Sequence, residues 1–97
     1  MSAFMLANIT VRQPDKFKKY LSAVQKLGSK YGAKLLIKGK ALRLITGGAC
    51  ESEMTIVVKF PSPESIDELF ESEEYRALIP LREEGAHIVM TSHHEME

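Results

Sequence analysis

The sequence has little cysteine, no net charge and no long apolar segment. The single cysteine, Cys50, excludes an intramolecular disulfide and is typical of a protein from a reducing compartment. Thirteen basic and thirteen acidic residues cancel, so no overall field favours nucleic acid or an anionic membrane. No apolar run approaches the roughly 20 residues of a membrane span, and the N-terminus lacks the features of a signal peptide. We therefore expect a cytoplasmic protein that binds neither nucleic acid nor membrane.

The sequence also lacks complete motifs for catalysis or metal binding. Gly47-Gly48 is not a phosphate loop, because no lysine or Ser/Thr follows in the required pattern and no helix is predicted there. His87, His93 and His94 do not have the spacing of a closed metal site. No Ser-His-Asp or Cys-His arrangement can be assembled from the spacing. The sequence therefore predicts no metal and no cofactor, and it does not identify a reaction.

What the sequence does contain is a strand that leads directly into a helix, within the stretch Met54–Tyr75. Apolar residues alternate along Met54–Phe60, as they do in a strand buried on one face. Pro61 has no N–H to donate and ends the ladder. Ser62 followed by Pro63 is typical of a helix N-cap and a first helical position. The strand therefore continues into a helix that must pack on its own sheet.

The rest of the chain continues this alternation of strands and helices. The other expected elements are a strand at Phe4–Val11, a helix from Pro14 to its C′ residue Gly32, a hairpin of strands Ala33–Lys38 and Ala41–Ile45 around Gly39-Lys40, a loop at Thr46–Glu53, a short helix from the N-cap Ser72 to Gly85, a strand at His87–Ser92 and a flexible polar tail at 93–97. This order predicts one α+β domain over residues 1–97, a ferredoxin-like βαββαβ protomer with an antiparallel sheet. Right-handed crossovers place both helices on one sheet face.

The two faces of the predicted sheet differ in composition. The helix side is apolar and consists of Met5, Ala7, Ile9, Val11, Leu35, Ile37, Ile56, Val58, Phe60, Ile88 and Met90. The opposite face is half apolar and half polar and consists of Phe4, Leu6, Asn8, Thr10, Lys34, Leu36, Lys38, Arg43, Ile45, Thr55, Val57, Lys59, His87, Val89 and Thr91. Monomers usually avoid an exposed apolar patch of this size. We therefore expect a homodimer that packs sheet against sheet.

Polar residues on this second face define a candidate ligand-binding cleft. The candidate residues are Asn8, Tyr31, Lys34, Arg43, Lys59 and His87. A partly dry basic cleft favours a small carboxylate or phosphate. Tyr31 joins the set because it stands beside the start of the Lys34 strand, whereas the other tyrosines occupy helix-packing positions. The alternative is that Lys34 and Arg43 sit at strand ends with their charged groups in water.

Four segments carry a resemblance to a known family. They are Ala7–Val11 followed by Pro14, Lys30–Lys34, Val58–Ser62, and Ser72–Tyr75 with Arg82 after it. With these segments the chain resembles the domain-of-unknown-function family 1330, within the dimeric α/β-barrel superfamily. The resemblance implies a ferredoxin-like protomer whose sheet pairs with a second copy into a barrel around a central cleft. It implies no established reaction, although the superfamily includes cofactor-free oxygenase, isomerase and lyase chemistry. The chain departs from the family at Lys59, where a glutamate is common.

Two functions from different classes stay open at this point. The first is a small homodimer that binds a small anionic or amphipathic metabolite in a cleft between the helices and the dimer barrel, with or without cofactor-free oxygenase- or isomerase-type turnover. The second is a non-enzymatic structural or regulatory dimer whose barrel interior is filled. Cavity volume separates them, because a pocket of roughly a few hundred Å³ with convergent polar groups favours ligand binding.

Overall fold

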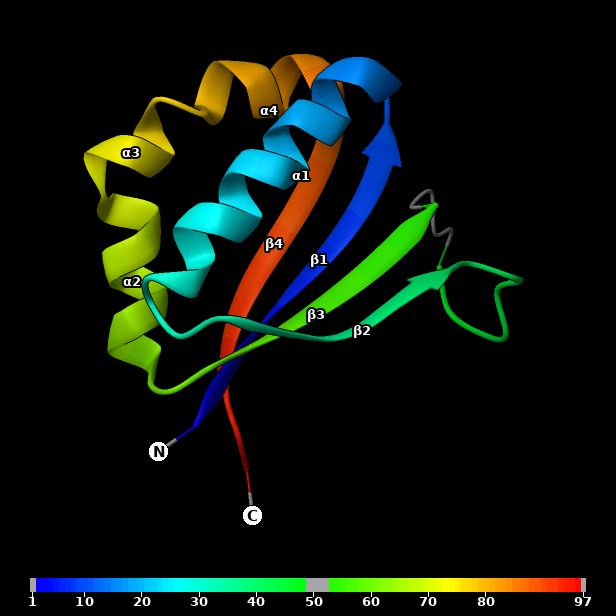
Figure 1. The fold of residues 1–97 in the computed structure, drawn as a ribbon. Helices are drawn as coiled ribbons and strands as arrows, with labels where there is room; N and C mark the ends of the chain where they lie inside the picture. The colour runs from blue at the N-terminus through cyan, green and yellow to red at the C-terminus, as the bar shows by residue number, and fades with distance from the viewer. Residues whose placement is uncertain (1, 49–52, 97) are drawn as a thin grey trace.

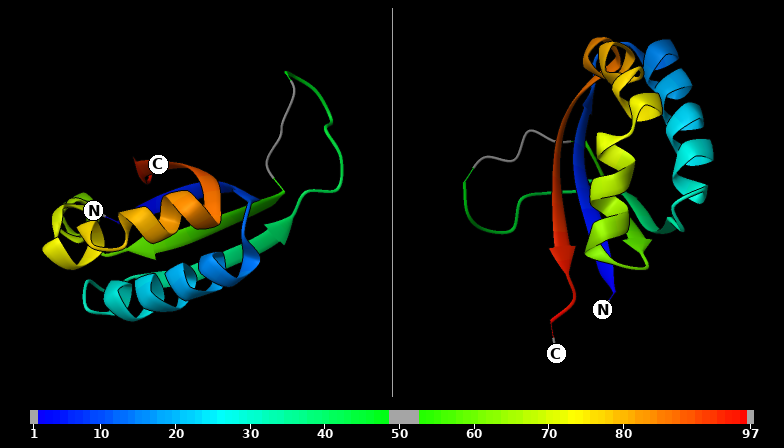
Figure 2. Two further views of the ribbon diagram at one scale, coloured as in Figure 1. Left: turned by 90° about the horizontal axis from the view of Figure 1, so that it is seen from above. Right: turned by 90° about the vertical axis from the view of Figure 1, so that its left-hand side faces the viewer.

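The computed structural model describes residues 2–48 and 53–96 and builds them into one sheet with helices on one side. In chain order the elements are β1 (Ala3–Val11), α1 (Pro14–Ser29), β2 (Lys34–Lys40), β3 (Met54–Phe60), α2 (Pro63–Glu71), α3 (Glu73–Arg76), α4 (Ile79–Gly85) and β4 (Ala86–His94). The strands are antiparallel in the order β2-β3-β1-β4. All four helices cover the same sheet face (Figures 1 and 2). The predicted ferredoxin-like α+β fold is confirmed.

The two predicted serine caps are present and set the directions of α2 and α3. The Ser62 hydroxyl accepts a hydrogen bond from the backbone N–H of Ser65 at 3.2 Å, and the Ser65 hydroxyl accepts one from the Ser62 N–H. Ser72 accepts from the Tyr75 N–H at 3.1 Å. Each cap satisfies donors that the first helical turn leaves unpaired. Because Pro63 follows the first cap directly, α2 begins as soon as β3 ends.

The turn after the C-terminus of α1 depends on a glycine. Gly32 has φ +79°, and a Cβ at this position would lie 2.6 Å from the Pro61 ring. Only glycine therefore fits both the backbone conformation and the space. The turn places the start of β2 against the end of β3, where Pro61 closes the strand.

The predicted hairpin between strands Ala33–Lys38 and Ala41–Ile45 is wrong. Gly39 and Lys40 do not form a turn; they continue β2 and pair with Thr55 and Met54 of β3. The ladder with β3 extends β2 past the glycine, because Gly39 has no positive φ and leaves the chain straight. The reversal instead occurs beyond residue 40, where the Ala41 N–H donates to the Glu53 carbonyl at 3.0 Å.

Residues 41–48 form an arm rather than a strand. The arm projects beyond the sheet, on the side away from the helices (Figure 2). Leu42 is 97% exposed, and Leu44 and Ile45 are also exposed. The predicted positions of Arg43 and Ile45 on a sheet face are therefore wrong, because no strand forms there. The predicted loop at Thr46–Glu53 falls partly outside the described residues.

A β-bulge in β2 exchanges two side chains between the faces of the sheet. Leu35 pairs with Val58 and Ile37 pairs with Val57, so Leu36 is the extra residue. After the bulge, Ile37 shares the face of Val57, away from the helices, and Lys38 lies on the helix side. The predicted faces of Ile37 and Lys38 are wrong, because one inserted residue inverts a period-two pattern.

The last strand extends two residues past its predicted end at Ser92. His93 pairs with Phe4, and His94 pairs with Ala3. The rings of Phe4 and His93 stack with centroids 4.8 Å apart. The prediction that the polar tail begins at residue 93 is therefore wrong for these two histidines, because β1 begins early enough to offer them ladder partners.

The core lies between the helices and the sheet. Its buried members are Ala3, Ala7, Ile9, Phe17, Tyr20, Leu27, Ile56, Phe60, Ile66, Leu69, Tyr75 and Ala86. Four of its sheet residues agree with the predicted helix side, namely Ala7, Ile9, Ile56 and Phe60, whereas Ala3 and Ala86 lie just outside the predicted strands. The opposite face, which we call the open face, keeps Val89 and Ile37 exposed. No helix covers it in the part of the chain that the structure describes (Figure 2).

Candidate functional site

The polar residues predicted from the sequence do not gather into one site within a protomer. Lys34 pairs with Lys59 at one end of the open face, whereas His87 pairs with Thr10 at the other end. Phe4, the β1 neighbour of Lys59, is six residues from Thr10, so the two ends are about 20 Å apart at ~3.3 Å per residue.

The three remaining predicted residues lie in three other environments, and Lys59 has a charged partner. Asn8 lies in the middle of the open face and accepts a hydrogen bond from the Thr55 hydroxyl at 3.1 Å. Tyr31 follows α1 and packs against the core on the helix side. Arg43 lies in the exposed arm. Lys59 forms an ion pair with Glu95 at 3.8 Å, with both side chains about half exposed.

A cavity of about 300 Å³ lies on the other side of the sheet, under the helices. It is enclosed by α1, α2 and the helix face of the strands. Its lining consists of Met5, Ala7, Ile9, Tyr20, Leu21, Val24, Gln25, Gly28, Ala33, Leu35, Lys38, Ile56, Val58, Leu69, Phe70, Ile88 and Met90. The polar lining residues are Tyr20, Gln25 and Lys38, and the others present apolar surface. This cavity is the candidate functional site.

Small and flexible side chains explain why the space stays open. Ala7 and Ala33 contribute little volume where longer side chains would fill the cavity. Gly28 lets the last turn of α1 approach Ala33, because a Cβ on Gly28 would lie 3.2 Å from the Ala33 Cβ. Met5 and Met90 supply unbranched walls that can adjust to a ligand.

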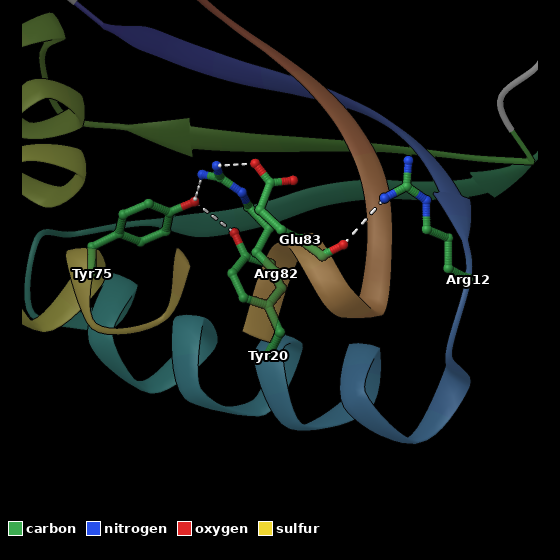
Figure 3. A network of polar contacts seen from close by, with 5 residues as sticks. All are labelled: Arg12, Tyr20, Tyr75, Arg82 and Glu83. Atoms are coloured by element: carbon green, nitrogen blue, oxygen red, sulfur yellow. Dashed lines mark hydrogen bonds and ion pairs between the residues drawn. The ribbon is translucent and has the colours of Figure 1, made fainter. Parts of the chain in front are cut away.

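A polar network runs from the cavity, at the buried Tyr20, to the protein surface, at Glu83 and Arg12 (Figure 3). The hydroxyls of Tyr20 and Tyr75 are 2.8 Å apart, and Arg82 Nη1 donates to the Tyr75 hydroxyl at 2.9 Å. Arg82 Nη2 donates to the Glu83 carboxylate at 3.1 Å, and Arg12 Nη1 donates to the Glu83 carbonyl at 3.2 Å. The network joins α1, α3 and α4 at the residues where these helices meet.

The electrostatics of the network keep Tyr20 and Arg82 protonated. Burial raises the pKa of Tyr20 well above its ordinary value, and the neighbouring Tyr75 raises it further. Burial lowers the pKa of Arg82, but its hydrogen bonds to Tyr75 and Glu83 outweigh that effect and leave the pKa above the ordinary value. Tyr20 is therefore a neutral hydrogen-bonding group, and Arg82 is a permanent cation.

The polar residues of the cavity were not among the residues predicted from the sequence. Tyr20 follows the apolar spacing of α1 and reads as an ordinary core tyrosine. Its partner Tyr75 is 55 residues away, so no local pattern connects them. Lys38 reaches the cavity only because of the bulge. The one sequence signal was that two tyrosines, Tyr20 and Tyr75, occupy buried helix positions, where hydroxyls need partners.

The described residues give no sign of a membrane span or a metal centre. Among residues 2–48 and 53–96, no helix is long and apolar enough to cross a membrane. Within the same ranges, no three His, Cys, Asp or Glu side chains gather closely enough to hold a metal ion.

Solved structures share this fold at low sequence identity. A protein of unknown function from Rhodopseudomonas palustris superposes with a TM-score of 0.82 at 15% identity, over 99% of this chain and 83% of that one. SnoaB, a cofactor-independent oxygenase from Streptomyces nogalater, gives 0.70 at 4% identity, over 99% and 94%. A dimeric ferredoxin-like protein of unknown function from Thermobifida fusca gives 0.60 at 17% identity, over 98% and 92%. The fold is therefore ferredoxin-like.

Sequence comparison places the chain in one family. No curated protein matches the sequence. The profile of the family described as "Domain of unknown function (DUF1330)" matches residues 2–93, nearly the whole chain. This match confirms the resemblance seen in the strand ends and helix starts of the sequence, and the chain belongs to the DUF1330 family.

Proposed function

We propose that this protein is a cytoplasmic homodimer that binds a small amphipathic organic molecule in the cavity between α1, α2 and the sheet. The observation that carries the proposal is the cavity itself, with about 300 Å³ of space, an apolar lining and three polar groups. Ligand sites in proteins are mostly apolar, with a few placed polar groups, and start at roughly 300 Å³. The cytoplasmic location is supported by the single cysteine.

The position of Lys38 favours a ligand with an anionic end. Lys38 contributes to the lining and is exposed to solvent, so the residue borders both the cavity and water. A carboxylate or phosphate at that point gains a charge-assisted hydrogen bond, while the apolar part of the molecule enters the cavity. The ligand class is therefore an amphipathic anion.

The open face supports the homodimer. Leu36, Ile37 and Val89 are between 51% and 63% exposed, and the similar Thermobifida fusca protein is dimeric. Packing two open faces together removes this apolar surface from water. In such a dimer Lys34 and Lys59 line the space between the sheets, so the sequence-derived basic cleft belongs to the interface.

Cofactor-independent turnover is a second candidate function. SnoaB, which has the same fold over 99% of this chain, is a cofactor-independent oxygenase. The support is analogy of fold together with a cavity of suitable size. Once a ligand is known, oxygen consumption by the purified protein tests this candidate, and a binding-only protein will show none.

Native mass spectrometry of the protein purified gently from its own cells tests the main proposal. We expect the mass of two chains plus a retained small molecule. Val24→Phe places a ring in the cavity, because Val24 lines it, and should lose the retained mass. Val11→Phe is the matched control, since Val11 packs against the core but does not line the cavity. A dimer that retains nothing and binds no small amphipathic anion supports the structural alternative instead.

A further inference from the structure

In the network of Tyr20, Tyr75 and Arg82, the two phenolic hydroxyls have two hydrogens to donate, but only one of these hydrogens has an acceptor. Two phenolic hydroxyls supply two hydrogens, and the single contact between them at 2.8 Å uses one. The other contact of the Tyr75 hydroxyl is with Arg82, which can only donate. Within residues 2–48 and 53–96 neither hydroxyl has a further hydrogen-bond partner. One phenolic hydrogen is therefore left over.

The arginine determines which hydroxyl keeps the spare hydrogen. Arg82 donates to the Tyr75 oxygen and draws electron density from it, which makes the Tyr75 O–H a stronger donor. A chain in which Arg82 donates to Tyr75 and Tyr75 donates to Tyr20 is cooperative, because each bond strengthens the next. In the reverse direction the Tyr75 oxygen accepts twice and its own hydrogen is stranded. The cooperative order leaves the hydrogen of Tyr20 unused.

Tyr20 is the member of this network that lines the cavity, whereas Tyr75 and Arg82 do not. Tyr20 is only 3% exposed, so water does not satisfy its hydrogen from the outer surface. A buried hydroxyl with an unpaired hydrogen is unfavourable, and an acceptor atom supplied by a ligand removes that cost. The burial that raises its pKa also keeps the group protonated as a donor.

We propose that Tyr20 donates a hydrogen bond to a carbonyl oxygen on the buried end of the cavity ligand, with Tyr75 and Arg82 acting as positioning residues. This inference rests on the proposed function, because it names the chemistry of the molecule in the same cavity. It makes the ligand an amphipathic carbonyl compound, with its anionic end at Lys38 and its carbonyl group at Tyr20. A carbonyl oxygen fits better than an ammonium or amide N–H, since the spare group is a donor.

A matched pair of probes isolates the carbonyl group. 1-Tetralone and tetralin have the same fused-ring skeleton and differ in one carbonyl oxygen. We expect both to bind the wild-type protein, measured by calorimetry. Tyr20→Phe should weaken 1-tetralone binding about three- to tenfold and change tetralin binding less than about twofold, as expected for loss of one hydrogen bond. Tyr31→Phe is the control, because Tyr31 does not line the cavity.

Infrared spectroscopy reads the hydrogen bond directly. The carbonyl stretch of 1-tetralone bound to the wild type should lie at lower wavenumber than in an apolar solvent, and Tyr20→Phe should remove the shift. Tyr75→Phe and Arg82→Gln keep the Tyr20 hydroxyl but weaken its polarisation, so each should reduce the shift without removing it. If Tyr75 and Arg82 had a merely structural role, their variants would not produce intermediate shifts of the carbonyl stretch. The wild-type spectrum alone tests the inference if a variant fails to fold.

The outcomes separate the two proposals. If both probes bind and Tyr20→Phe affects them equally, or if the bound carbonyl stretch is unshifted, the role of Tyr20 is overturned and cavity binding stands. If neither probe binds the wild type, the role of Tyr20 is overturned, and the cavity proposal is decided by the native mass spectrum, because neither probe carries the anionic end placed at Lys38.

Discussion

The two faces of the sheet are made by alternate residues of the same strands, yet they differ in how they are covered and how completely they are packed. In β3, Ile56 is 7% exposed beneath the helices, whereas its neighbour Val57 points to the open face, which no helix among residues 2–48 and 53–96 covers. The helix face is closed within one protomer but leaves about 300 Å³ unfilled. The open face keeps apolar side chains in water. Covering a face and filling it are therefore separate properties, and the covered face here is the one with room for a ligand.

The largest expected effect comes from placing a charge on the open face. Val57→Asp should weaken dimerisation by about 3–5 kcal/mol, because the carboxylate would be buried without a partner between the two sheets. Sedimentation velocity at micromolar concentration should show a dimer for the wild type and a folded monomer for the variant. If the wild type sediments as a compact monomer, the proposal that a second copy covers the open face is wrong.

A slightly smaller effect is expected one residue earlier, on the helix face. Ile56→Ala should lower the free energy of unfolding by about 2–4 kcal/mol, through lost burial and an enlarged cavity. Urea denaturation measures this loss, and the dimerisation constant should stay close to the wild-type value. If Ile56→Ala instead dissociates the dimer without loss of protomer stability, the two faces have been assigned the wrong way round.

Two lysines on opposite faces sharpen the comparison for ligand binding. Lys38→Met should weaken binding of an amphipathic carboxylate to the cavity by about 1 kcal/mol, or roughly fivefold, because it removes a partly exposed charge-assisted contact. Lys34→Met, on the open face, should leave that affinity unchanged. Titration calorimetry with a short-chain fatty acid supplies both numbers. If Lys34→Met loses more affinity for the carboxylate than Lys38→Met, the anion binds at the interface and not at the cavity.

The smallest expected effect concerns the ion pair at the edge of the open face. Glu95→Gln removes the partner of Lys59, and both side chains are about half exposed. Exposed pairs contribute between about 0 and 1 kcal/mol, so the melting temperature should change by only a few degrees at most. A drop of ten degrees would show that Glu95 is buried by the second protomer.

The fold follows from patterns that are local in the sequence, whereas the cavity does not. Alternation in Met54–Phe60 and the cap at Ser62 each specify their own structure, and both are confirmed. The end of β2 is set by a ladder with a distant strand, so Gly39-Lys40 suggested a turn that does not form. A cavity is the difference between the space enclosed and the volume of the side chains within it. No single residue indicates this difference in volume. The pairing of Tyr20 with Tyr75 is equally non-local, because the two residues are 55 positions apart.

The bulge at Leu36 takes up one residue of β2 without changing the partners of the residues on either side of it. Loss of the single codon for Leu36 restores strict alternation in β2 and keeps every other amino acid. Ile37 then still pairs with Val57 on the open face, and Lys38 still pairs with Ile56 on the helix side. That in-frame deletion therefore leaves the cationic entrance of the cavity in place, whereas a straight β2 that kept Leu36 would carry Lys38 to the open face.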